Sequence, residues 1–210
     1  LYQPIRKGEK YFFFPYHYLM DAQMLYREPY IDQCRLIENI SHCLPYGTFL
    51  YTRAHPGYWG SDLPYNMVKK ILSLPNVRFV TTEVLSREVI ENAIAIFTIN
   101  STTGYEAVLL NKPLITFGHE LYSRKGVSIV VRDFNELPNI IFKVMSDPNW
   151  GVDIERRKEF IYKIRKNAIP IEGRKTPKVD FYAIYEFTQN DYRRIAEALV
   201  KSYENYDRAM

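Results

Sequence analysis

The sequence predicts an α/β fold in which a Rossmann-like parallel sheet carries helices on both of its faces. Between residues 10 and 146, short apolar runs of strand length alternate with longer segments of helical periodicity, a pattern typical of parallel sheets. The runs are almost continuously apolar, as expected of strands that are buried on both faces. Polar side chains follow each run, and an open parallel sheet collects such side chains at one edge.

The predicted strands share their short length and their content of aromatic and β-branched residues. They cover residues 11–15, 48–52, 77–80, 94–99, 114–117 and 127–131. The predicted helices between them cover residues 30–44, 64–74, a short segment that begins at Ser86, 105–110 and 133–146. We expect the Ser86 side chain to cap its helix, and Asn111 to end the 105–110 helix in the left-handed conformation.

Beyond residue 150 the pattern is mostly helical, over residues 154–167 and 190–206. The segment between these helices contains two prolines and a glycine, which favour irregular chain over residues 168–187. We therefore expect a linker over residues 1–9, a Rossmann-like domain over 10–150, and a helical extension over 151–210 that packs on it. The chain begins on a leucine, so we expect a fragment whose N-terminal part is missing.

Composition excludes several classes of function. The 210 residues carry a net charge of only +4, without the dense basic runs that nucleic-acid binding needs. Cys34 and Cys43 have no metal-ligand spacing, and we expect two reduced thiols in a cytoplasmic protein. No acidic cluster has the spacing of a metal site, and no Gly-x-Gly-x-x-Gly or Walker sequence occurs, so we expect no metal and no other cofactor. No apolar run is long enough to cross a bilayer.

The stretch 93–118 reads as strand, tight turn, short helix and strand. Its turn contains Ser101, Thr102, Thr103 and Gly104, three hydroxyl side chains and one residue that readily adopts a positive φ. Backbone N–H groups at the start of a helix form an anion site, which phosphate commonly occupies. The alternative is an ordinary crossover in which these side chains only cap the helix.

Five polar loops are expected at the carboxyl edge of the sheet, where such folds bind ligands. Their candidate ligand-binding residues, besides the turn, are Arg53, His55, Glu83 and Glu106. Arg53 and His55 could contact a phosphate, and Glu106 could accept hydrogen bonds from ribose hydroxyls or simply favour its helix N-terminus. His17 and Asp21 could form a proton-transfer pair or belong to an ordinary surface loop.

Four segments carry a resemblance to a known family. They are YFFFPYHYLMDAQ (11–23), YIDQCRLIENI (30–40), FLYTRAHPG (49–57) and TINSTTGYEAVLLNKPLITFG (98–118). In order and spacing they resemble capsule polysaccharide biosynthesis glycosyltransferases, in the C-terminal half of the two-domain GT-B architecture. The resemblance implies a single GT-B C-terminal-type domain, followed by C-terminal helices, that binds a nucleotide-sugar donor for transfer to a growing glycan.

The resemblance also implies roles for individual residues. Glu106, with Ala107 and Pro113, matches the pattern that closes the donor site, so Glu106 would hold the ribose. The 101–104 turn and His55 would hold the phosphates. Three positions depart from the family pattern: Asn111 replaces a glycine, Asp21 stands in an altered loop, and Thr98 replaces a second glutamate. The donor nucleotide, whether of the UDP, CMP or GDP type, stays open.

The implied partners are the donor, a glycan acceptor and a missing N-terminal domain that supplies the general base. We therefore expect these residues to bind donor and to turn it over poorly alone. We expect a cytoplasmic location, with peripheral association at the inner face of the membrane left open. The alternatives are a UDP-sugar 2-epimerase-like enzyme and a non-catalytic interaction domain that kept the fold.

Overall fold

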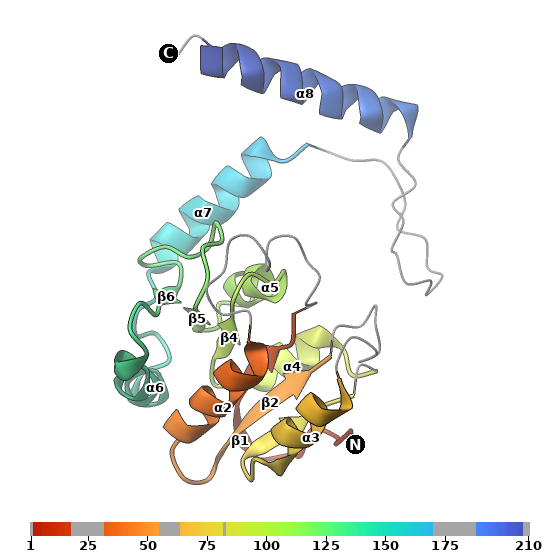
Figure 1. Cartoon of the computed structure of the whole chain (residues 1–210). Helices are drawn as coiled ribbons and strands as arrows, with labels where there is room; N and C mark the ends of the chain where they lie inside the picture. The colour runs from red at the N-terminus through yellow and green to blue at the C-terminus, as the bar shows by residue number, and fades with distance from the viewer. Residues whose placement is uncertain (1, 18–31, 55–63, 82, 170–187, 208–210) are drawn as a thin grey trace. The chain divides into compact units, whose positions relative to one another are not determined.

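The fold was analysed in a computed structural model, which describes residues 2–17, 32–54, 64–81, 83–169 and 188–207. The chain divides into two compact units, residues 1–161 and 162–210. The first unit contains a six-stranded sheet in which every paired strand is parallel, in the order β3-β2-β1-β4-β5-β6 (Figure 1). The predicted Rossmann-like α/β fold is confirmed.

Strands and helices alternate along the first unit. The strands are β1 (Lys10–Pro15), β2 (Thr48–Arg53), β3 (Val77–Phe79), β4 (Ile96–Thr98), β5 (Leu114–Thr116) and β6 (Ile129–Val130). The helices are α2 (Gln33–Cys43), α3 (Tyr65–Ser73), α4 (Ser86–Asn92), α5 (Thr103–Leu109), the 3₁₀ turn η1 (Phe134–Glu136) and α6 (Leu137–Ser146).

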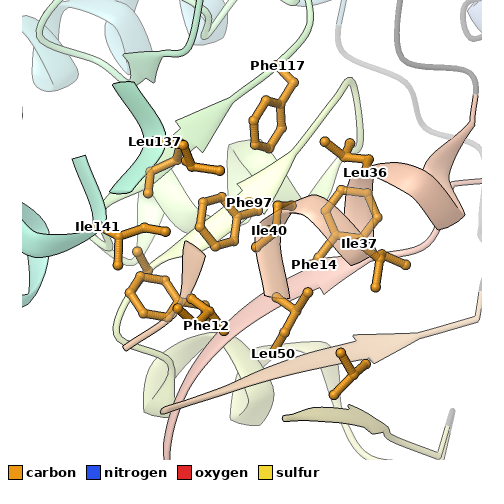
Figure 2. Packing of buried hydrophobic residues seen from close by; sticks show 14 of the residues in the cluster. Phe12, Phe14, Leu36, Ile37, Ile40, Leu50, Phe97, Phe117, Leu137 and Ile141 are labelled. Carbon is orange, nitrogen blue, oxygen red and sulfur yellow. The ribbon is translucent and has the colours of Figure 1, made fainter. Parts of the chain in front are cut away.

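Successive side chains of β1 point to opposite faces of the sheet. Both sets of side chains are buried, so the sheet is covered on both faces. Phe12 and Phe14 pack into a cluster with side chains of α2 and α6, as Figure 2 shows. On the other face, the Tyr11 hydroxyl donates to the carbonyl of Val89 in α4 at 2.8 Å. Burying one such aromatic side chain contributes about 1.5–3 kcal/mol, so the apolar run of β1 anchors both layers.

Several element boundaries differ from those predicted. The strand expected over 127–131 is confined to Ile129–Val130, and the helix expected from 133 begins as η1 before α6. Helix α5 starts at Thr103, so two residues expected in the turn belong to its first turn. Ser86 is the first residue of α4, whose cap position is Leu85. Asn111 has φ of 53°, the predicted left-handed conformation.

The N-terminal residues contribute to the sheet at its β3 edge. Gln3 forms a parallel bridge with Val80, and its N–H donates to the carbonyl of Phe79 at 2.7 Å. The opposite side of this strand bonds to β2, since the Val80 N–H donates to Thr52 at 2.8 Å. Gln3 therefore lies along the outer side of β3.

Helix α7 (Ile154–Asn167) contains the division between the units, and α8 (Gln189–Asp207) lies in the second. A reciprocal cap begins α8. The Thr188 N–H donates to Asp191 Oδ2 at 2.8 Å, and the Asp191 N–H donates to Thr188 Oγ1 at 3.1 Å. The irregular segment predicted between these helices lies mostly outside the described residues, and the expected domain bounds stay predictions. Among the described helices, none is long and apolar enough to cross a membrane.

Candidate functional site

The strand order predicts a ligand-binding crevice at the carboxyl ends of β1 and β4. From β1 the chain builds the sheet outward through β2 and β3, and it then crosses back to place β4 on the other side of β1. Ligands of open parallel sheets bind at such a reversal. The chain segments that leave β1 and β4 there begin with Tyr16 and with Ile99, so His17 lies two residues beyond the end of β1.

His17 joins the two sides of this crevice. Its Nε2 accepts hydrogen bonds from the N–H groups of Ile99 and Asn100, at 3.3 and 3.2 Å. An acceptor Nε2 places the ring proton on Nδ1, which lies 3.2 Å from Gln33 Oε1. The side chain is only 6% exposed. Both ring nitrogens are thus bonded within the protein, which favours a structural role over the proton transfer expected for His17; Asp21 lies outside the described residues.

The turn before α5 satisfies much of its own hydrogen bonding. The N–H of Ser101 donates to Thr98 Oγ1 at 3.2 Å, and the N–H of Thr103 donates to Ser101 Oγ at 3.1 Å. The Gly104 N–H donates to the carbonyl of Ser101 at 3.0 Å. These amides, expected to face an anion, therefore have partners in the protein. Thr102 is exposed, and its own side chain makes no capping hydrogen bond to the helix.

Gly104 is required for a reason other than the expected positive φ, since it lies within α5 and is not among the positive-φ glycines. A Cβ at this position would lie 2.4 Å from Cζ of Tyr122. The Tyr122 hydroxyl also donates to the carbonyl of Ser101 at 2.8 Å. The segment after β5 is thereby clamped onto the start of α5. Sequence reasoning missed Tyr122, because nothing local to either residue signals this contact.

The side chain of Arg53, at the end of β2, also donates its hydrogen bonds to acceptors within the protein. It is 5% exposed, and its Nη1 donates to the carbonyl of Val84 at 2.7 Å. Its Nη2 donates to Ser86 Oγ at 2.5 Å. The Ser86 hydroxyl, which was expected to cap α4, therefore accepts a hydrogen bond from Arg53 instead. His55, expected to bind phosphate beside Arg53, lies outside the described residues.

Glu106 presents a carboxylate from α5 on the same side of the sheet. It is half-buried, and burial raises the pKa of its carboxyl while the positive charge of Arg53 lowers it. Within the described part of the chain, no hydrogen bond or ion pair engages this carboxylate. Glu106 therefore keeps its acceptor capacity for a ligand.

Asn100 was not singled out from the sequence as a ligand-binding residue. Its backbone N–H donates to His17, but its side-chain Nδ2 is buried without a hydrogen-bond partner among the described residues. An unpaired buried donor costs about 1–3 kcal/mol, so a ligand oxygen placed there would be stabilising. The only sequence signal was its position directly after the strand predicted over residues 94–99.

Two further acidic side chains lie on neighbouring loops. Glu83 is exposed, and its N–H donates to Thr81 Oγ1 at 3.3 Å. Glu120 accepts a hydrogen bond from the hydroxyl of Tyr105 at 3.3 Å. Burial raises the pKa of Tyr105, and the charge of Glu120 raises it further. These contacts leave the ligand-binding role expected for Glu83 a prediction.

A hollow of about 510 Å³ lies at the opposite, amino-terminal edge of the sheet. Its lining includes Lys10, Ile94, Lys112, Pro113 and Met145. It contains none of the residues expected to bind a ligand. No group of three or more His, Cys, Asp or Glu side chains in the described ranges could hold a metal ion.

Comparison with known proteins identifies one family and several similar structures. The family model described as "Capsule polysaccharide biosynthesis protein" matches residues 4–132. Protein FixF of Sinorhizobium fredii is 26% identical over 168 residues, covering 76% of this chain and 38% of its own length.

Similar solved structures include two sugar-processing enzymes. The beta Kdo 2,7 transferase KpsC of Thermosulfurimonas dismutans has a TM-score of 0.49 and 21% identity, covering 65% of this chain and 45% of that one. The UDP-GlcNAc 2-epimerase of Methanocaldococcus jannaschii, in complex with UDP-GlcNAc and UDP, has a TM-score of 0.47 and 16% identity, covering 75% and 45%. The chain spans less than half the length of each of these proteins.

Proposed function

The chain belongs to the family of capsule polysaccharide biosynthesis proteins, and from this premise we propose that it binds the nucleotide-sugar donor of a GT-B glycosyltransferase. The observation that carries the proposal is the family match over residues 4–132, which includes every element that forms the crevice between β1 and β4. The enzyme would transfer a sugar from this donor to a growing surface polysaccharide.

Glu106 supports the proposal as the group that holds the ribose. An ionised carboxylate only accepts hydrogen bonds, and the two ribose hydroxyls are donors. The carboxylate projects from α5 with no bonded partner among the described residues. A ribose would thus use an acceptor that the protein itself leaves available.

The donor phosphates would meet side chains more than backbone amides, because several amides of the 101–104 turn are bonded internally. The exposed hydroxyl of Thr102 and the unpaired Nδ2 of Asn100 are the available donors on this turn. Breaking a sugar–phosphate bond leaves negative charge on the phosphate, and donors fixed in advance stabilise that charge. His55, which follows β2 by two residues in the sequence, would add a further donor.

A complete reaction also requires a general base for the acceptor hydroxyl. His17 is bonded at both ring nitrogens, so we place this base outside the described residues, in a second domain. The chain alone would then bind donor and transfer sugar poorly.

Calorimetric titration with UDP, CMP and GDP tests the proposal directly. We expect one of the three to bind with a micromolar-range dissociation constant, and binding of none by a folded sample would contradict the donor site. Incubation of the longer protein with UDP-N-acetylglucosamine alone is the second test. Conversion to the 2-epimer without an acceptor would replace the transferase by an epimerase.

A further inference from the structure

Arg53 spans two parts of the proposed donor site. It ends β2, and its guanidinium donates to the carbonyl of Val84 and to the hydroxyl of Ser86, at 2.7 and 2.5 Å. Those acceptors lie in the loop after β3 and at the first residue of α4. Arg53 therefore links the end of one strand to the loop that leaves the neighbouring strand.

This guanidinium is buried and forms no ion pair with the residues that the structure describes. Arg53 is 5% exposed, its charge lies 5.9 Å from the ring centroid of Phe13, and no carboxylate of the described residues reaches it. Burial of an unpaired cation is costly. The negative charge of Glu106 is the one electrostatic influence that opposes this cost among the described groups. The two side chains thus form a separated charge pair, with neither bonded directly to the other.

We propose that Arg53 is a positioning residue of the donor site, which fixes residues 84–86 and keeps Glu106 in its hydrogen-bond-accepting form without touching the donor phosphates. This inference rests on the proposed function and adds the means by which the same site is held ready. Arg53 would therefore increase the binding affinity of a nucleoside as much as that of a nucleoside diphosphate.

The burial and bonding of Arg53 argue against a phosphate contact. Both terminal nitrogens already donate to protein acceptors, and a 5% exposed side chain presents little surface to a ligand. A diphosphate would have to displace Val84 or Ser86 to obtain a bidentate contact. The protein acceptors would then be left unpaired.

The electrostatic surroundings of Glu106 are simple. Burial raises the pKa of its carboxyl, and Arg53 is the one described charge that lowers it. The neighbouring helix α4 carries Arg87, Glu88 and Glu91, all of them exposed. Strands β4 and β5, which also pack against α5, have no charged residue. Removal of Arg53 is therefore expected to raise the pKa of Glu106 further and to neutralise it at a higher pH.

The test compares Arg53→Met and Arg53→Lys with the unaltered protein, using the best-binding nucleotide of UDP, CMP and GDP together with its nucleoside. We expect Arg53→Met to weaken both ligands by the same factor, and most strongly at acidic pH, because Glu106 is then protonated at a higher pH. The pH below which affinity falls is expected to be higher for Arg53→Met than for the unaltered protein. Arg53→Lys keeps the charge and restores the pH profile in part. Arg87→Met, which removes an exposed arginine of α4, serves as the matched control and leaves affinity unchanged.

Two results would overturn the inference. A loss confined to the diphosphate, with nucleoside affinity intact, would make Arg53 a phosphate ligand. An unchanged pH profile in Arg53→Met would remove its influence on Glu106. If none of the nucleotides binds the unaltered protein, the proposed function fails, and carbon-detected NMR titration of Glu106 still decides the inference: its pKa must rise in Arg53→Met.

Discussion

The hydroxyl of Tyr122 donates to the carbonyl of Ser101 at 2.8 Å, and the tyrosine ring occupies the space that a side chain at position 104 would need. This contact joins the segment after β5 to the start of α5. Tyr105 packs edge-on against the same ring, with the centroids 4.8 Å apart. The turn that follows β4 is therefore held from outside as well as by its own hydrogen bonds.

Gly104→Ala should destabilise the protein by about 1–3 kcal/mol, the usual cost of overpacking a filled site. The added Cβ would lie 2.4 Å from the Tyr122 ring. Chemical denaturation measures the loss. In a Tyr122→Leu background the same change should cost less, because the ring is gone. Equal costs in the two backgrounds would show that the close approach is unimportant.

His17→Ala should lower the free energy of unfolding by about 2–4 kcal/mol. The change leaves the N–H groups of Ile99 and Asn100 without their acceptor, and each unpaired buried donor costs about 1–3 kcal/mol. His42→Ala, at an exposed position near the end of α2, is the control and should be nearly neutral. If His17→Ala abolished transfer in the longer enzyme with stability intact, the proton-transfer role would be restored.

Glu106→Gln should weaken nucleotide binding by about tenfold or more, since it replaces a charged acceptor by a neutral one. The melting temperature should stay nearly constant, because the described residues make no hydrogen bond to this carboxylate. Calorimetry and thermal unfolding on the same samples separate the two effects. Glu88→Gln, at an exposed position of α4, is the control. A large loss of stability with unaltered affinity would make Glu106 structural.

Cys34 should react slowly with iodoacetamide in the folded protein. Burial raises the pKa of its thiol from 9.0 to about 11, so the thiolate present at pH 8 falls about a hundredfold. Cys43, half-buried on the same helix, is the internal comparison. Mass spectrometry of peptides after timed alkylation gives both rates. Equal rates for Cys34 in folded and urea-unfolded protein would contradict the expected protection.

The fold was largely predictable because its signal is local. The apolar run of β1 marks a strand buried on both faces, and the pattern over 154–167 marks α7, whose observed bounds are Ile154–Asn167. The left-handed Asn111 was equally readable, since few residue types tolerate that conformation. Helix starts were less predictable: the Ser86 hydroxyl bonds to the distant Arg53, and α5 begins at Thr103, earlier than the expected start at residue 105.

The location of the site stays a prediction, and several contacts of its residues could not be predicted from the sequence. The strand order reverses between β1 and β4, where open parallel sheets bind ligands. The hydrogen bonds of the Arg53 and His17 side chains to Val84 and Ile99 join residues that are 31 and 82 positions apart along the chain. Tyr122, whose ring a Cβ at position 104 would meet, is likewise 18 positions away from Gly104 in the sequence. The spacing of residues in the sequence does not predict such contacts, because they form only once the sheet has assembled.

The pairing of Gln3 along the outer side of β3 has a consequence for how the protein behaves in concentrated solution. An uncovered strand at the border of a sheet recruits strands from other molecules, which is a common route to fibrils and precipitates. The bond from the Gln3 N–H to the Phe79 carbonyl occupies one such docking position. Deleting the first few residues would therefore be expected to cost solubility, even though those residues lie far along the chain from every group that the proposed donor would meet.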